Sequence, residues 1–139
     1  MPMRLGSPMP PLEGATGSYN AEGFDPAQLS GHPVLIHFWA VSCHICHEVM
    51  DQVLQYRDMY QPKGLKVVAI HMPKEEGDLD TAKVERDIAQ YGITQPVLLD
   101  HRHALAQAFQ NQFVPAFFLF DAQGNLLFRA AGDKGLQNL

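Results

Sequence analysis

The sequence predicts an α/β domain with a central mixed β-sheet flanked by helices. Short and nearly continuous apolar runs, which are typical of strands buried on both faces, alternate with stretches of helical periodicity. The first long helical stretch lies between two such runs, in the strand-helix-strand order of a parallel pair. Near the end, two apolar runs flank the turn sequence 121–125, which makes the last two strands antiparallel.

The first half of the chain is predicted to hold two strands joined by a long helix. Residues 34–40 are almost all apolar, as in a strand buried on both faces. Residues 43–60 carry apolar side chains at helical spacing, so one stripe of this helix faces the sheet, with Arg57 extending its charge to solvent. A second strand follows at 65–70, and a helical turn at 25–29 precedes the first.

The second half is predicted to insert a helix, a strand and a helix before the last hairpin. Asp80 can cap a helix over 81–91, which Gly92 ends. The remaining elements are expected as a strand at 96–99, a short helix at 103–109, strands at 114–120 and 126–130, and a helix opening at 132–139. In space, the four long strands are expected in the order second, first, third, fourth.

Length and composition limit the class of protein. The 139 residues correspond to one domain, 1–139, in which residues 1–20 form an extended lead-in with a short strand near 12–14. The net charge of −5 and the lack of a basic cluster argue against nucleic acid as a partner. No apolar run is long enough to span a membrane, and residues 1–8 do not resemble a secretory signal, so we expect a cytoplasmic location.

The two cysteines of the chain lie where the first strand passes into the long helix. Cys43 and Cys46 are one helical turn apart, so they can close a disulfide. The helix N-terminus favours a thiolate at Cys43, and the thiolate is the attacking species. We therefore predict a redox dithiol with Cys43 as nucleophile and Cys46 as resolving thiol. No cofactor is expected, because the sulfur atoms themselves carry the electrons.

The segment Phe38-Trp39-Ala40-x-x-Cys43-x-x-Cys46, together with Val114-Pro115, resembles the TlpA/ResA type of thiol–disulfide oxidoreductases. Shorter motifs at 36–39, 69–73 and 93–96 are similar to a soluble bacillary member of this family, and the resemblance covers roughly residues 5–139. It implies the thioredoxin fold, with the insertion at 78–111. It also implies exchange with protein disulfide substrates, an upstream dithiol reductant and a monomeric state.

The resemblance further implies how a substrate docks. The Val114-Pro115 peptide bond should be cis, so that the backbone of Val114 faces a substrate strand at the dithiol. Trp39 and Gly132 should complete the docking surface with Val114; the alternatives are that Trp39 fills the core and that Gly132 only forms a turn.

Three further residues are expected to support the dithiol. His37 stands where thioredoxin has a buried acid, and it could either take up the proton of Cys46 or be a hydrogen-bonded core histidine. His44 and Ile45, between the cysteines, should tune the reduction potential. A protonated His44 would stabilise the Cys43 thiolate and make the protein more oxidising than thioredoxin.

Two other interpretations of the cysteines stay open on the residues alone. Cys43 and Cys46 could bind zinc or copper together with two histidines drawn from His37, His44, His47 and His71. The run from Cys43 to His47 also spells C-x-x-C-H, the signature of covalent haem attachment. Haem attachment does not require the preceding strand or Val114-Pro115. Metal ligands on one continuing helix would spread around it, so a closed tetrahedral site would need a second element, and we therefore favour the redox dithiol.

Overall fold

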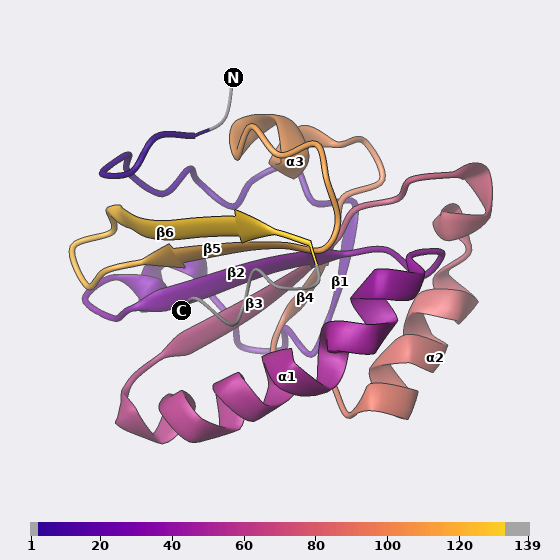
Figure 1. Ribbon diagram of the computed structural model, residues 1–139, viewed down its shortest axis with the longest axis horizontal. Coiled ribbons are helices and arrows are strands. Elements are labelled where there is room, and N and C mark those ends of the chain that lie inside the picture. Colours follow the sequence, from indigo (N-terminus) through magenta and orange to yellow (C-terminus); the bar gives the residue numbers. More distant parts are fainter. Residues whose placement is uncertain (1–2, 133–139) are drawn as a thin grey trace.

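The computed structural model describes residues 3–132, and its central feature is a six-stranded mixed sheet in the order β1-β4-β3-β2-β5-β6 (Figure 1). The strands are β1 (Gly17–Tyr19), β2 (Val34–Trp39), β3 (Lys66–His71), β4 (Val97–Leu99), β5 (Ala116–Phe120) and β6 (Leu126–Ala131). β3 pairs in parallel with β2 and with β4, and the other three pairings are antiparallel. The predicted fold class and the order of the four long strands are confirmed.

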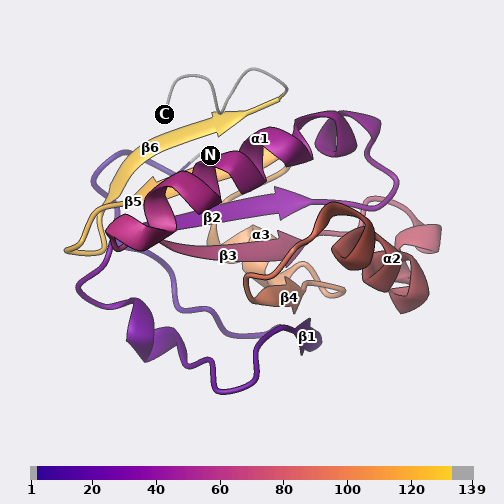
Figure 2. The ribbon, with the colours of Figure 1, turned by 90° about the horizontal axis from the view of Figure 1, so that it is seen from below.

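Helices cover both faces of the sheet. α1 (His44–Tyr60) and α2 (Thr81–Tyr91) lie on one face, below the sheet in Figure 1, and α3 (Ala104–Ala108) lies on the other (Figures 1 and 2). Three short 3-10 turns complete the elements: η1 (Pro26–Leu29), η2 (Gln61–Lys63) and η3 (Glu76–Leu79). Among the described residues, no helix is long and apolar enough to cross a membrane.

The core forms on both faces because the central strands are apolar throughout. All six residues of β2 are buried. On the α3 face, Phe38, Phe109 and Phe118 pack edge to face with ring centroids 5.3–5.7 Å apart. On the α1 face, Val49, Met50 and Val53 of the predicted stripe are buried against the sheet. The rigid centre of the sheet therefore holds the start of α1 in place.

Capping residues set the ends of α2 as predicted. Asp80 accepts a hydrogen bond from the backbone N–H of Ala82 at 3.0 Å, and Gly92 ends the helix with a φ of +71°. The helix expected to open at 132–139 lies, apart from Gly132, outside the described residues.

The strand predicted near residues 12–14 is wrong. The lead-in instead forms β1 at Gly17–Tyr19, antiparallel to β4. Gly14 has a φ of +94°, and a Cβ placed there would lie 2.8 Å from the Cβ of Ala104. The chain therefore turns against α3 at Gly14 and reaches the sheet edge only afterwards, where the Thr16 N–H donates to the Leu99 carbonyl at 2.8 Å.

Candidate active site

Cys43 and Cys46 form a disulfide at the N-terminus of α1. Cys43 is the N-cap residue, and its Sγ accepts a hydrogen bond from the backbone N–H of Cys46 at 3.1 Å. This donor and the positive end of the helix dipole both favour negative charge on that sulfur when the disulfide is reduced. The Cys46 side chain is buried, with an exposed fraction of 1%, whereas Cys43 is partly exposed. Only the first sulfur is within reach of another molecule.

The loop before β5 faces the disulfide. The Val114-Pro115 bond is cis, as predicted. The carbonyl oxygen of Val114 lies 3.7 Å from Cys43 Sγ. At the end of β6, the Gly132 N–H donates to the Pro115 carbonyl at 3.0 Å, with a φ of +89° that favours glycine. Gly132 thus lies next to the Val114-Pro115 loop, although its part in docking stays a prediction.

Trp39 lies in the core and not on the docking surface. Its exposed fraction is 1%, its Nε1–H donates to Asp87 Oδ2 at 3.0 Å, and its ring forms a T-shaped pair with that of His71, with centroids 5.1 Å apart. This burial corrects the prediction that Trp39 offers a surface to substrates. The physical reason is the insertion, because α2 brings Asp87 over the end of β2 and covers the indole.

Asp87 also holds the helix that carries the cysteines. The same Oδ2 atom lies 2.8 Å from Nε2 of His47, whose ring stacks on Tyr91 at 5.4 Å. Asp87 therefore joins β2, α1 and α2 beside the resolving cysteine. We did not predict this role, but the sequence contains a signal: Asp87 interrupts the apolar spacing formed by Val84, Ile88 and Tyr91.

Replacing Asp87 with Ala should lower the free energy of unfolding by about 2 kcal/mol, because the Trp39 indole N–H is left buried without an acceptor. Trp39 is the single tryptophan of the chain, so its fluorescence should also change. Urea unfolding followed by fluorescence measures both effects. The matched control is Glu85→Ala on the same helix, which loses only an exposed hydrogen bond to Tyr19. Equal losses in the two variants would contradict the role of Asp87.

His37 belongs to a buried polar chain. The Arg57 guanidinium donates to Gln95 Oε1 at 2.7 Å, so the Gln95 amide nitrogen, 2.9 Å from His37 Nε2, must donate to the imidazole. Burial, with the charge of Arg57 as a second cause, lowers the pKa of His37 to about 3. A neutral imidazole that already accepts a hydrogen bond is a poor base for Cys46. The structure therefore favours the core histidine of the two alternatives.

Contrary to the prediction, Arg57 does not extend its charge to solvent. Its side chain is buried, and besides Gln95 it donates to the Gly92 carbonyl at 3.2 Å and to Asp58 Oδ1 at 2.9 Å. These acceptors compensate the desolvation of the cation. The sequence contains a signal for this arrangement, because Arg57 lies on the apolar stripe of the helix, where a charge needs partners inside the protein.

Two polar contacts anchor the segment between Trp39 and Cys43. The backbone N–H of Val41 donates to Nε2 of the fully buried His71 at 3.2 Å, and the Ser42 hydroxyl donates to Asp78 Oδ2 at 2.8 Å. Burial is the main cause that lowers the pKa of His71 to about 4, so the ring stays neutral and keeps its acceptor nitrogen. The residues before the nucleophile are thereby fixed from two elements.

The two residues between the cysteines point to solvent. The Nε2 atom of His44 lies 2.9 Å from Glu48 Oε1, and both side chains are exposed. Any positive charge on His44 is therefore shared with a carboxylate, which reduces its effect on Cys43. Ile45 is 43% exposed and provides apolar surface beside the disulfide.

The described residues do not support the metal-binding interpretation. Within residues 3–132, no three His, Cys, Asp or Glu side chains gather as a metal-binding group. The four histidines considered for such a site contact Gln95, Glu48, Asp87 and the Val41 amide, respectively.

The mixed sheet, the disulfide at the start of a helix and the cis proline opposite it together define a thioredoxin-like thiol–disulfide oxidoreductase. Residues 4–137 match the family model described as Redoxin, and the chain belongs to this family. This membership leaves the haem-attachment interpretation without support.

Relatives confirm the predicted resemblance. The chain is 45% identical over 137 residues to the thiol-disulfide oxidoreductase YkuV of Bacillus subtilis. The matched region covers 99% of this chain and 92% of YkuV. The chain is 24% identical over 111 residues to ResA of Bacillus anthracis, covering 80% of this chain and 61% of ResA. A solution structure of a thioredoxin-like protein in the oxidized form superimposes with a TM-score of 0.86 at 48% identity, over 96% of this chain and 89% of that one.

Proposed function

We propose that the protein exchanges disulfides with protein substrates, with Cys43 as nucleophile and Cys46 as resolving thiol. The Cys43 thiolate attacks a substrate disulfide, forms a mixed disulfide and releases one substrate thiolate. Cys46 then attacks Cys43 Sγ and releases the second substrate sulfur. The substrate gains two electrons and two protons, and the protein is left with the Cys43–Cys46 disulfide. No cofactor takes part, because the sulfurs hold the electrons.

The asymmetry between the two sulfurs carries this proposal. Cys43 Sγ is partly exposed and receives the Cys46 N–H at the positive end of α1. Cys46 is 1% exposed, so a foreign disulfide cannot reach it. The remaining role for Cys46 is therefore to attack Cys43 Sγ within the protein.

The contacts around Cys43 support a docking surface that differs in part from the predicted one. The Val114 backbone faces the nucleophile, Gly132 lies beside Pro115, and the exposed Ile45 provides apolar contact. In this proposal His44 and Ile45 tune the potential, while Trp39 acts only by supporting the site from the core.

The same proposal includes a dithiol reductant upstream, a monomeric protein that acts as one domain, and a cytoplasmic location. It is supported by cysteine usage: both cysteines of the chain belong to the redox pair, as expected in a reducing compartment. Oxidation by the substrate must be reversed there by another thiol.

Alkylation of the reduced protein tests the assignment of the nucleophile. Iodoacetamide should modify Cys43 at least about tenfold faster than Cys46, with an apparent pKa below the ordinary thiol value of about 8.5. Peptide mapping by mass spectrometry measures both rates against pH, and a Cys43→Ser variant gives the rate of Cys46 alone. Equal rates, or a Cys43 that reacts only at high pH, would overturn the assignment.

A further inference from the structure

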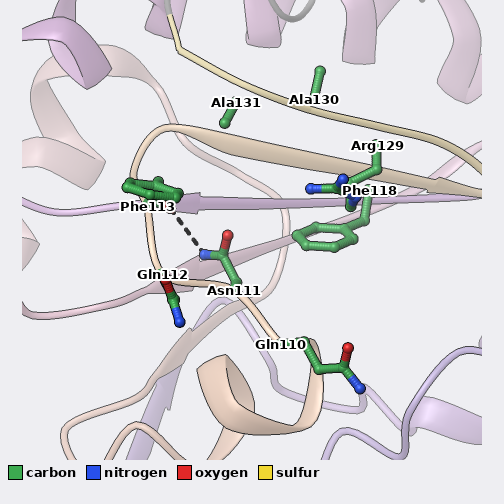
Figure 3. Close-up of a pocket in the computed structure, with 8 residues that line it drawn as sticks. All are labelled: Gln110, Asn111, Gln112, Phe113, Phe118, Arg129, Ala130 and Ala131. Atoms are coloured by element: carbon green, nitrogen blue, oxygen red, sulfur yellow. Dashed lines mark hydrogen bonds between the residues drawn. The ribbon is translucent and has the colours of Figure 1, made fainter. Parts of the chain in front are cut away.

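A cavity of about 150 Å³ lies beside the loop that faces the dithiol. Residues 110–113, directly before Val114, form one wall, and the edge strand β6 forms the other, with the buried Phe118 at its base (Figure 3). We call it the Phe113 pocket. The Val114 carbonyl is 3.7 Å from Cys43 Sγ, and Phe113 of the pocket is the residue directly before Val114, so the pocket begins next to the group that faces the nucleophile.

The lining of the Phe113 pocket combines one cation with apolar and amide groups. Among the described residues that line it, Arg129 is the only charged one, and its guanidinium extends beside Phe118 toward the loop (Figure 3). Arg129 is exposed and takes part in none of the ion pairs found within residues 3–132. Gln110 and Gln112 add amide donors, and Phe113, which is 65% exposed, adds an aromatic face.

The one charged residue in the lining of the pocket, Arg129, has the opposite sign to the net charge of the protein. The chain has a net charge of −5, yet a second cation joins Arg129 at the loop, because Lys74 Nζ donates to the Gln112 carbonyl at 3.0 Å. A substrate rich in acidic groups would be repelled by most of the surface and attracted here. The local sign therefore selects for negative charge close to the reacting cystine.

We propose that the Phe113 pocket binds an acidic side chain of the protein substrate, from a residue close in sequence to the cysteine that reacts with Cys43. The inference rests on the proposed exchange at Cys43. A guanidinium matches a carboxylate with two parallel hydrogen bonds, and the rings of Phe113 and Phe118 pack against the methylene groups that precede it. A cavity of this volume holds one side chain and not a second strand, as a cavity of roughly this size holds one benzene molecule.

Peptide disulfides of defined charge test the proposal. Symmetric disulfide dimers of a short peptide carry Glu, Gln or Lys two or three residues from the cysteine, on each side in turn. The reduced protein is mixed with each dimer, the reaction is stopped with acid, and released thiol is measured by chromatography. Each rate is divided by the rate with neutral hydroxyethyl disulfide. We expect the Glu peptide to react about 3- to 10-fold faster than the Gln peptide on one side of the cysteine, and the Lys peptide to react slowest.

Charge variants assign the preference to the Phe113 pocket. Arg129→Gln should bring the ratio of Glu to Gln rates close to one, and Arg129→Glu should make the Lys peptide the fastest. Lys63→Glu, at the far end of α1, changes the net charge by the same amount and should keep the preference for Glu. A preference that survives Arg129→Glu, or equal rates for all peptides with the unmodified protein, would overturn the inference. If no peptide reacts at all, the proposed exchange itself has failed.

Discussion

A Cys46→Ser variant should accumulate as a stable mixed disulfide with its substrate, whereas Cys43→Ser should lose exchange altogether. Without Cys46, no other thiol of the protein can attack Cys43 Sγ, because the chain has only these two cysteines, so the mixed disulfide stays until an external reductant is added. Without Cys43, the remaining sulfur is 1% exposed at the base of the site. Removing a covalent nucleophile of this kind lowers the rate by at least about a thousandfold.

Non-reducing electrophoresis of a cell extract, followed by mass spectrometry of the adduct, measures the trapping. Adding dithiothreitol should release the substrate. The double variant Cys43→Ser and Cys46→Ser is the control for capture that does not involve these thiols. Adducts formed by Cys43→Ser through Cys46 would reverse the roles of the two cysteines.

Acid should destabilise the protein through two buried histidines, with a loss of about 4 kcal/mol in the free energy of unfolding between pH 7.5 and pH 5. The pKa is about 3 for His37 and about 4 for His71, both below the ordinary 6.5. Below pH 6.5 the unfolded chain binds both protons, whereas down to pH 5 the folded protein binds neither. The stabilisation is therefore complete above pH 6.5 and is lost as the pH falls, at about 1.4 kcal/mol per pH unit for each histidine.

The environments of the two histidines differ, and this permits a check on each. His37 faces the charge of Arg57, whereas His71 faces His101 and the carboxylates of Asp78 and Asp87, which oppose the effect of burial on its pKa. Urea unfolding at a series of pH values gives the slope. His37→Gln and His71→Gln should each reduce the number of protons taken up on unfolding by one. A free energy of unfolding that stays constant from pH 7.5 to pH 5 would contradict the prediction.

Local patterns were sufficient to predict most of the fold. Continuous apolar runs identify β2, β3 and β5, and the caps at Asp80 and Gly92 set the ends of α2. β1 was misplaced because a three-residue edge strand has almost no apolar signal of its own. Its position depends on β4, some 80 residues away in sequence, with which it pairs from Gly17 to Tyr19.

The dithiol was predictable from the spacing of the two cysteines at the start of a helix, and the cis proline from the resemblance to the family. The residues that support the dithiol and the cis proline could not be predicted, because only the tertiary structure brings each of them to its partner. Trp39 was expected at the surface since nothing near it in sequence shows that the carboxylate of Asp87 covers it. Two of these supporting residues, Arg57 and Asp87, do leave a signal in the sequence. Each is an ionisable residue on an otherwise apolar helix stripe.

The position of Val114 opposite Cys43 has a consequence for biosynthesis. The two residues are 71 positions apart in the chain. β2 likewise pairs along one edge with β5, which is synthesised much later. At about 5–20 residues per second, a ribosome needs on the order of 4 to 14 seconds to deliver the later segment after the cysteines. During that interval the later segment does not limit access to the two thiols, which can attack small disulfides such as oxidised glutathione and release one thiolate each time. The loop that faces Cys43 is therefore delivered only with about the last fifth of the translated chain.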